Sequence, residues 1–298
     1  MENIYEKCNL CPRECGVNRK IQKGYCRSGE KLLVARAALH YWEEPCISGD
    51  NGSGTVFFGG CSIRCIYCQN CEIRDGKVGK EISTERLAEI FLELQDKNAN
   101  NINLVTPTHY IPHIIEALDC AKLRGLKLPV VYNTGGYEKA ETLKMLNGYV
   151  DVYLPDFKYI SSDTAKEYSN APDYADYAKT ALGEMVNQVG NPQFDERGIM
   201  TKGVIVRHLL LPGHLEESKK VVEYLFNTYG NKIYLSLMNQ YTPMPKMASH
   251  PVLSKRVTDE EYDELINFAV DIGVENGFIQ EGETALESFI PPFDNSGV

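Results

Sequence analysis

The sequence predicts an α/β protein, an incomplete (β/α)6 TIM-like barrel with a small cysteine-rich metal-binding segment at its N-terminus. Two observations lead to this fold class. From residue 54 onward, short apolar runs alternate with segments of helical periodicity, which is typical of a parallel sheet with helical crossovers. Before that point, four of the ten cysteines fall within residues 8–26, and a short segment with little apolar core folds on binding metal. A doubly wound open sheet is the alternative arrangement.

Each expected element follows from a local pattern. The expected strands are short apolar runs, at 55–58, 102–105, 129–132, 150–154, 204–209, 233–237 and 277–280. The expected helices show helical periodicity, with one beginning at Ser83 and others at 112–123, 138–146, 216–229 and 258–272. Ser83 suits an N-cap because its hydroxyl can accept a backbone N–H of the first turn. Residues 161–202 do not fit one helix, so two helical pieces and loops are expected there, flanking the mouth of the active site.

Length, charge and cysteine content limit which domain organisation and which class of protein are possible. The 298 residues suffice for one large domain with a small appendage, and we expect a cysteine-rich segment at 1–50 and a partial barrel at 51–298. The 31 basic and 41 acidic residues give a net charge of −10, which argues against binding to nucleic acid or to an anionic membrane. The sequence has no long apolar run and no signal-peptide core, so the expected location is a reducing cytoplasm.

The most informative motif is a group of three cysteines directly after the first expected strand. Cys61, Cys65 and Cys68 have the spacing C-x3-C-x2-C and follow two glycines. Thiolates are the usual ligands of iron–sulfur clusters. Because a cubane has four irons, three cysteines leave one iron open, as a catalytic site requires. A zinc knuckle or three core cysteines are the alternatives, although zinc sites usually close with four ligands.

The spacing of these cysteines, with an aromatic residue before the last of them, resembles the signature of the radical S-adenosylmethionine (SAM) superfamily. The resemblance implies a 4Fe–4S cluster whose open iron binds SAM. It also implies reductive cleavage of SAM to a 5′-deoxyadenosyl radical, which abstracts a hydrogen atom from a substrate. The implied electron donor is flavodoxin or ferredoxin. No catalytic acid or base is expected, since radical abstraction does not require one.

Further segments resemble the radical SAM proteins that are pyruvate formate-lyase activating enzyme-like. They stand in order along the chain, at 43–49, 52–58, 103–109, 132–137, 151–158, 206–214 and 236–243. This resemblance makes a glycyl radical enzyme a candidate partner, activated at a backbone glycine. Two departures favour a small molecule or a peptide as the alternative substrate. The Gly-Gly-Glu stretch of the activating enzymes is replaced by residues 106–109, and the simplest activating enzymes lack the N-terminal cysteines.

The resemblance also implies which residues contact SAM. The candidates are Tyr67, Gln69, Thr106, Thr108, Asn133, Asp156, Lys158, Arg207 and Gln240. Tyr67 is expected near the adenine, Lys158 at the methionyl carboxylate, and Asp156 at Lys158 or a ribose hydroxyl. Arg207 lies inside an apolar strand and is costly to bury unpaired, so a carboxylate partner is expected. Gln240 stands where the activating enzymes carry a ribose-contacting histidine.

The remaining cysteines and an acidic pair complete the expectations. The N-terminal group has the spacing C-x2-C-x3-C-x10-C, and it consists of Cys8, Cys11, Cys15 and Cys26. Structural zinc and an auxiliary iron–sulfur cluster are both open for it. Cys46, Cys71 and Cys120 are expected to be free thiols. Residues 43–44, two glutamates, are expected to be a solvated acidic pair.

Two rival functions belong to other classes. A non-catalytic zinc-binding interaction protein would use both cysteine groups structurally, and it would be colourless and would bind no SAM. An RNA-modifying protein would need a basic face, which the acidic composition does not favour.

Overall fold

The computed structural model describes residues 4–280 and 291–298, and these residues build one ten-stranded sheet. Along the sheet the strands follow the order β10-β9-β8-β6-β5-β4-β2-β1-β3, with β7 paired to β8. Their bounds are β1 Leu32–His40, β2 Ser53–Phe58, β3 Lys80–Ile82, β4 Ile102–Val105, β5 Val130–Thr134, β6 Val152–Pro155, β7 Gln193–Phe194, β8 Met200–Leu209, β9 Tyr234–Met238 and β10 Gly277–Ile279.

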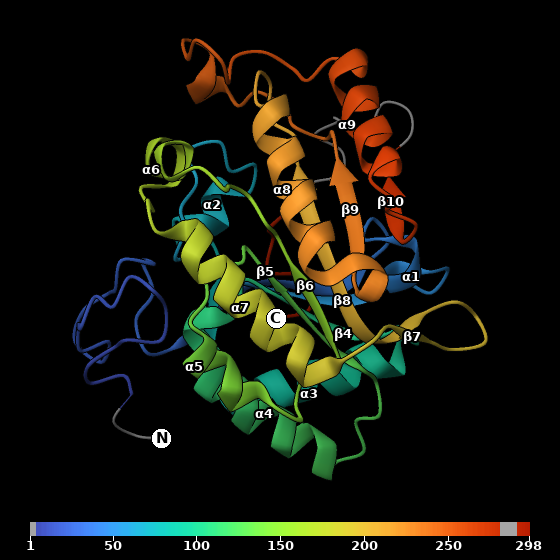
Figure 1. The fold of residues 1–298 in the computed structure, drawn as a ribbon. Coiled ribbons are helices and arrows are strands. Elements are labelled where there is room, and N and C mark those ends of the chain that lie inside the picture. The colour runs from blue at the N-terminus through green and yellow to red at the C-terminus, as the bar shows by residue number, and fades with distance from the viewer. Residues whose placement is uncertain (1–3, 281–290) are drawn as a thin grey trace.

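The seven predicted strands are the parallel part of this sheet. Strands β2, β4, β5, β6, β8, β9 and β10 pair in parallel and in chain order. A doubly wound sheet reverses its strand order at a switch point, and no reversal occurs here. Because crossovers between parallel strands are right-handed, this order puts their helices on one face, where Figure 1 shows α4, α5, α7 and α8. The predicted α/β fold is therefore confirmed, with its mostly parallel sheet.

The helices match the expected periodic segments closely. Their bounds are α1 Pro45–Ser48, α2 Cys71–Arg74, α3 Thr84–Asp96, α4 Ile111–Leu123, α5 Ala140–Leu143, α6 Ser162–Ser169, α7 Tyr174–Val189, α8 Leu215–Tyr229 and α9 Asp259–Asp271. Short 3-10 helices span Thr108–Tyr110, Lys144–Leu146, Gly230–Lys232 and Pro245–Met247. Ser83 caps α3 by accepting the Arg86 N–H, as predicted. The segment 161–202 holds two helices, also as predicted, and it adds the short strand β7.

Three strands were not expected from the sequence. Strands β1 and β3 form an antiparallel edge beside β2, and β7 is a two-residue strand antiparallel to β8. Strand β1 carries Arg36 between apolar residues and is only partly buried, so its pattern is weaker than that of a central parallel strand. Since β1 lies before residue 50 and belongs to the same sheet, the domain boundary at residue 50 stays a prediction.

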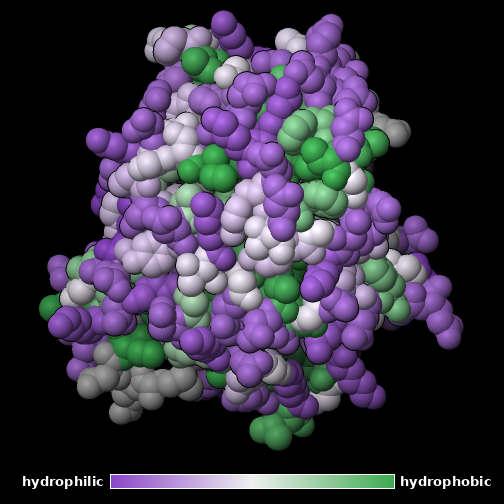
Figure 2. Space-filling model, viewed as in Figure 1, coloured by the Kyte–Doolittle hydropathy of each residue, from purple (hydrophilic) through white to green (hydrophobic). Residues whose placement is uncertain are grey.

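The face of the molecule that the helices form is mainly polar. Figure 2 shows a mainly hydrophilic surface over the helices, with small scattered hydrophobic patches. The buried residues of α3 are its apolar ones, on one side of the helix, which leaves polar residues toward solvent. Among the described helices, none is long and apolar enough to span a membrane.

The N-terminal segment is held by specific contacts to the rest of the chain. It contains no helix or strand between residues 4 and 31. Arg13 donates from Nε to the Ser62 carbonyl at 2.9 Å and from Nη2 to the Ser169 carbonyl at 2.8 Å. The Cys61 N–H donates to the Cys26 carbonyl at 3.1 Å. These bonds join the segment directly to the loop of the three-cysteine motif.

Candidate active site

A cavity of about 610 Å³ lies at the carboxyl ends of the parallel strands. This is where α/β barrels carry their active sites. Its wall contains the three cysteines of the motif and all nine predicted SAM-contacting residues. The structure therefore brings together, from many separate parts of the chain, every side chain that the sequence singled out for this site. Their roles toward SAM stay predictions.

The cysteine loop leaves β2 through a turn that requires glycine. Gly60 has a φ of +95°, and a Cβ at this position would lie 2.7 Å from the Cys26 carbonyl oxygen. Any other residue would combine backbone strain with a steric clash. Gly60 therefore turns the chain so that the cysteine loop begins with Cys61 in the cavity wall.

Two hydroxyl groups that the sequence did not identify lie close to the Cys65 sulfur. Ser169 Oγ donates to Cys65 Sγ at 3.1 Å, and Tyr159 OH lies 3.9 Å from the same sulfur. Tyr159 OH also donates to Tyr67 OH at 2.7 Å. Such bonds orient a metal-binding sulfur and tune the metal. The sequence analysis missed Ser169 and Tyr159 because they lie about a hundred residues from Cys65 and belong to no recognised motif.

The three thiols fit an iron–sulfur cluster. Burial raises the pKa of Cys61, and burial with the neighbouring Cys65 raises the pKa of Cys68 to about 12. Thiols in such surroundings become thiolates only when a strong positive charge binds to them. Within the described residues, no three His, Cys, Asp or Glu side chains are arranged around a single ion. Each cysteine thiolate of a 4Fe–4S cluster binds a different iron, so the cysteine sulfur atoms stand further apart than the ligands of one ion.

Asp156 and Lys158 form an ion pair in the cavity wall. Lys158 Nζ lies 2.5 Å from Asp156 Oδ2, and the lysine side chain is only 17% exposed. Burial lowers the pKa of Lys158, but the adjacent Asp156 outweighs it and the pKa lies above its usual value. Lys158 is therefore a half-buried, charged donor held by Asp156, and not a solvated strand-end lysine.

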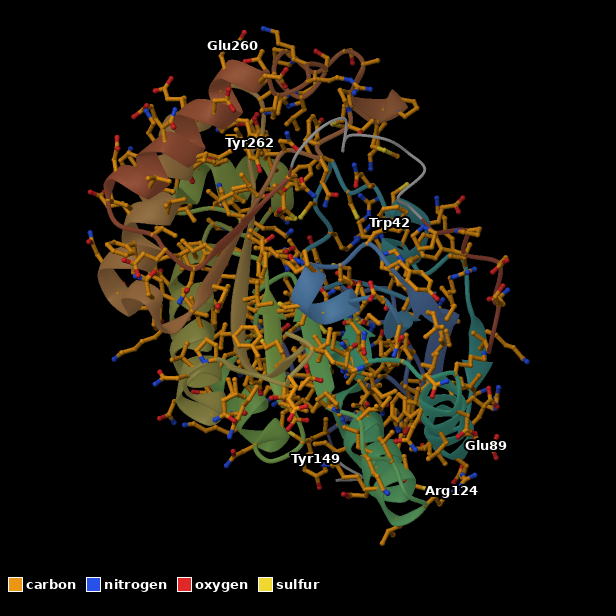
Figure 3. The ribbon with its side chains drawn as sticks, turned by 90° about the vertical axis from the view of Figure 1, so that its right-hand side faces the viewer. Trp42, Glu89, Arg124, Tyr149, Glu260 and Tyr262 are labelled. Carbon is orange, nitrogen blue, oxygen red and sulfur yellow. The ribbon has the colours of Figure 1, made fainter. Side chains whose placement is uncertain are left out.

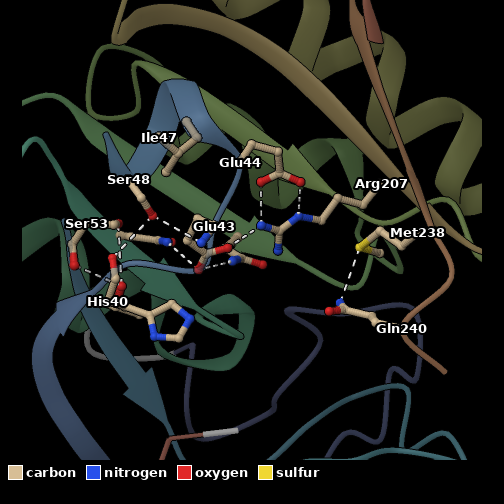
Figure 4. Close-up of polar contacts among 12 residues, drawn as sticks. His40, Glu43, Glu44, Ile47, Ser48, Ser53, Arg207, Met238 and Gln240 are labelled. Carbon is tan, nitrogen blue, oxygen red and sulfur yellow. Dashed lines mark hydrogen bonds and ion pairs between the residues drawn. The ribbon is translucent and has the colours of Figure 1, made fainter. Parts of the chain in front are cut away.

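Arg207 has its carboxylate partners within the protein. It donates from Nε to Glu44 Oε1 at 2.7 Å and from Nη2 to Glu44 Oε2 at 2.5 Å (Figure 4). Nη2 also donates to Glu43 Oε2. Burial raises the pKa of Glu44, but the Arg207 guanidinium more than offsets it, so the pKa lies below the usual value. The expectation of a solvated acidic pair was wrong, because both glutamates are buried against this arginine. The position of Arg207 inside an apolar run was the sequence signal that called for a carboxylate partner.

Two glutamines close another part of the wall. Gln69 Nε2 donates to the Gln240 carbonyl at 3.0 Å. The side chain of Gln240 contacts Met238 Sδ at 3.5 Å (Figure 4) and accepts from Gln280 at 3.3 Å. Both predicted glutamines thus lie together at the carboxyl end of β9.

A buried carboxylate stands behind two threonines of the wall. Glu138 is 1% exposed, and its Oε1 accepts from Thr108 Oγ1 at 2.5 Å and also from Thr134 Oγ1. Burial raises the pKa of Glu138 to about 7. Because both hydroxyl hydrogens are used on Glu138, the two threonine oxygens can only accept hydrogen bonds from the cavity. The sequence missed Glu138, which lies outside every recognised motif position.

Glu138→Gln is expected to change the pH dependence of stability. A carboxyl whose pKa is raised in the folded state binds its proton more tightly there, so wild-type stability falls as pH rises through about 7. Relative to the variant, the wild type should lose about 2 kcal/mol between about pH 5.5 and 8.5. Urea unfolding across this range checks the result. Glu89→Gln, which removes an exposed carboxylate of α3 (Figure 3), is the control, and parallel curves for wild type and Glu138→Gln would contradict the prediction.

The N-terminal cysteines lie together outside the cavity. Cys8, Cys11 and Cys26 are buried and Cys15 is half-buried. A Cβ at Gly24 would lie 3.3 Å from Cys15 Sγ and 3.5 Å from Cys26 Sγ, so these two thiols gather around the glycine. Burial raises the pKa of Cys11 to about 12. Binding of a metal here stays a prediction.

A comparison of the chain with protein families decides its classification. The profile of the radical SAM superfamily matches residues 55–225, which is more than half of the chain. The chain belongs to the radical SAM superfamily. This family implies a 4Fe–4S cluster and SAM as cofactors, in agreement with the cysteine loop and the cavity beside it.

The chain is also similar to individual proteins. The chain is 30% identical over 278 residues to "Uncharacterized protein MJ0674" of Methanocaldococcus jannaschii, covering 90% of this chain and 75% of that protein. It is 25% identical over 194 residues to the pyruvate formate-lyase-activating enzyme of Clostridium pasteurianum, covering 62% of this chain and 72% of the enzyme.

Solved structures share the fold. The chain superposes with a TM-score of 0.50 on Streptococcus suis SuiB bound to S-adenosylmethionine, at 14% identity, covering 75% of this chain and 49% of SuiB. It superposes equally, at 12% identity, on anSMEcpe with bound AdoMet, covering 74% of this chain and 61% of anSMEcpe. The chain therefore spans about half to three fifths of the length of these proteins.

Proposed function

We propose that this radical SAM enzyme reductively cleaves S-adenosylmethionine and removes a hydrogen atom from a bound substrate. One observation carries the proposal: three thiols from a single loop line the same cavity as the half-buried Asp156–Lys158 ion pair. When bound, the cluster and SAM supply a 5′-deoxyadenosyl radical in the cavity. The three cysteines leave a fourth iron open for SAM.

The chain's own residues bind and orient SAM in this proposal. Lys158 pairs with the methionyl carboxylate, while Asp156 holds the Lys158 ammonium in place. The acceptor oxygens of Thr106 and Thr108 face the methionyl ammonium, and Glu138 fixes the Thr108 hydroxyl. The remaining predicted contacts come from Tyr67, Gln69, Asn133, Arg207 and Gln240. Enclosure by these side chains keeps water from the reactive radical.

The proposed electron donor is flavodoxin or ferredoxin, in the cytoplasm. None of the ten cysteines, all within the described residues, forms a disulfide, which fits a reducing compartment. The N-terminal cysteines are proposed to bind zinc or an auxiliary iron–sulfur cluster. In either case the metal would fix Cys26, whose carbonyl accepts the Cys61 N–H.

Two kinds of substrate are consistent with this chemistry. The similarity to a pyruvate formate-lyase-activating enzyme supports a glycyl radical enzyme as partner. The second candidate is a small molecule or a peptide, which is favoured by the replacement of the Gly-Gly-Glu stretch at residues 106–109 and by the N-terminal cysteines.

Anaerobic reconstitution of the full chain with iron and sulfide tests the proposed function. We expect a brown protein whose reduced cluster gives an electron paramagnetic resonance signal that changes on addition of SAM. With dithionite it should form 5′-deoxyadenosine and methionine. A protein with a fully loaded, reducible cluster that forms no 5′-deoxyadenosine would refute the proposal. A colourless zinc protein would favour the structural-metal alternative.

A further inference from the structure

One arginine of the N-terminal segment binds the loop that carries the three cysteines of the motif. Arg13 lies within the N-terminal cysteine group, and it is not among the residues that line the cavity. Its Nε donates to the Ser62 carbonyl at 2.9 Å, and its Nη2 donates to the Ile63 carbonyl at 3.3 Å. Both carbonyls belong to the residues between the first two cysteines of the loop. Arg13 therefore holds the backbone of the cysteine loop from outside the cavity.

The same guanidinium also binds the C-terminal end of α6. Nη2 donates to the Ser169 carbonyl at 2.8 Å, and Nη1 donates to the Asn170 carbonyl at 2.5 Å. Ser169 is the last residue of α6, and Asn170 follows it in the left-handed conformation, with a φ of +47°. The last carbonyls of a helix have no partner within the helix, and arginine is suited to bind them. Arg13 thus joins the end of α6 to the cysteine loop.

Two tyrosine rings fix the plane of the Arg13 guanidinium. Its central carbon lies 4.2 Å from the centre of the Tyr25 ring and 5.0 Å from the centre of the Tyr137 ring. A planar guanidinium can stack on aromatic rings while its N–H groups donate several hydrogen bonds. A lysine has the same charge but neither the plane nor the fork of donors. The contacts of Arg13 therefore depend on the shape of its guanidinium as well as on its charge.

Ser169 connects this arrangement to the cysteine sulfur. Its carbonyl accepts from Arg13, while its hydroxyl donates to Cys65 Sγ at 3.1 Å. Ser169 is 2% exposed, and Tyr159 OH lies 2.8 Å from the same hydroxyl oxygen. A thiolate bound to iron has no hydrogen to donate, so it can only accept this bond. Hydrogen bonds to the sulfur atoms are among the factors that set the reduction potential of an iron–sulfur cluster.

Other bonds hold the loop and the helix together without Arg13. The Ile66 N–H donates to the Tyr168 carbonyl at 2.9 Å, and Arg74 Nη1 donates to the Cys65 carbonyl at 2.7 Å. We therefore expect the fold and the cysteine loop to persist when Arg13 is replaced, while the last residue of α6 gains freedom to move. The hydroxyl bond to the sulfur is the interaction that this freedom weakens, because hydrogen bonds weaken steeply when their geometry is lost.

We propose that Arg13 is a positioning residue for the iron–sulfur cluster, and that it acts by keeping the Ser169 hydroxyl on Cys65 Sγ. Through this bond Arg13 raises the reduction potential of the cluster, which eases the transfer of one electron to it from flavodoxin or ferredoxin. The inference rests on the proposed function, because it takes Cys65 as a ligand of the cluster. It gives the N-terminal segment a role at the active site that is independent of the metal its own cysteines bind.

The reduction potentials of matched variants test the inference. Wild type, Ser169→Ala, Arg13→Lys and the double variant are reconstituted anaerobically as full chains, and the reduced cluster is followed by electron paramagnetic resonance during a redox titration. The Cys61/Cys65/Cys68→Ala variant identifies any signal from the N-terminal cysteines, so that this signal can be subtracted. We expect the potential to fall by about 59 mV in Ser169→Ala, an about ten-fold change in the ratio of reduced to oxidised cluster, because a hydrogen bond to a charged group contributes about this much.

Arg13→Lys separates the position of the Ser169 hydroxyl from the positive charge. This variant keeps the charge and loses the contacts, so its potential should also fall. The double variant should have the potential of Ser169→Ala, because both changes remove the same interaction and their effects are then not additive. Arg27→Lys, which changes an exposed arginine of the same segment, should keep the wild-type potential.

Several results would overturn the inference. An unchanged potential in Ser169→Ala would show that the hydroxyl does not act on the cluster, and a wild-type potential in Arg13→Lys would show that charge alone matters. Additive shifts in the double variant would show that the two residues act independently. An Arg13→Lys chain that does not fold, as judged by circular dichroism, would mean that Arg13 serves the fold and not the Ser169 bond.

Formation of 5′-deoxyadenosine by the wild type is measured in parallel. A wild type that shows the expected shifts but forms no nucleoside refutes only the proposed function. A wild type that cleaves SAM while the variants show no shift refutes only this inference. A wild type that binds no cluster at Cys61, Cys65 and Cys68 refutes both.

Discussion

Replacing Cys61, Cys65 and Cys68 together by alanine is expected to abolish the cluster and all SAM cleavage. The three thiols line one cavity, and a 4Fe–4S cluster held by three cysteines loses its protein ligands when all three are replaced. After anaerobic reconstitution, the variant should contain about four irons fewer per chain than the wild type. With dithionite and SAM it should form no 5′-deoxyadenosine above the rate without enzyme, as measured by liquid chromatography.

Two comparisons make this result specific. Cys120→Ala, which removes a half-buried thiol of α4, should keep both the iron and the activity. About eight irons in the wild type and about four in the triple variant would place a second cluster at the N-terminal cysteines. Full iron content and nucleoside formation in the triple variant would show that the radical chemistry does not depend on this loop.

Removal of the Arg207 side chain is expected to lower the free energy of unfolding substantially. Arg207→Ala removes the one cation that pairs with the Glu43 and Glu44 carboxylates among the described residues, and their side chains are just 7% and 5% exposed. Breaking a buried ion pair from one side costs about 3–5 kcal/mol. The loss should shrink as the pH falls toward 5, because carboxyl groups buried without a cation have raised pKa values and become neutral by taking up protons.

Urea unfolding of the variants measures this effect. Arg197→Ala is the matched control, because Arg197 is 58% exposed and pairs with Asp195 at the surface, where ion pairs contribute at most about 1 kcal/mol. Adding Glu44→Gln and Glu43→Gln to Arg207→Ala should recover part of the stability, since no buried charge then remains. A loss in Arg207→Ala no larger than that in Arg197→Ala would show that the glutamates find other partners or reach solvent.

The parallel part of the fold was predictable because its signals are local. Buried parallel strands are continuous apolar runs, and each of the seven expected runs is a strand of the sheet. The antiparallel strands β1 and β3 were missed, since both are partly exposed and carry polar residues such as Arg36 and Lys80. For the site, strand order alone places the cysteine loop and the polar residues at the strand ends on the same side of the sheet.

The sequence by itself determined the parallel sheet through its apolar runs and the cysteine loop through its spacing, because both are properties of neighbouring residues. The resemblance to the radical SAM superfamily added nine further residues, all of which line the cavity. Only the tertiary structure decided which of these side chains pair. It set Glu43 and Glu44 against Arg207, across more than 160 residues of chain. It also set Ser169 against Cys65, and Glu138 behind Thr108. Such pairings arise because a charge or hydroxyl that is buried without a partner is costly, and the sequence shows the need for a partner but not its position.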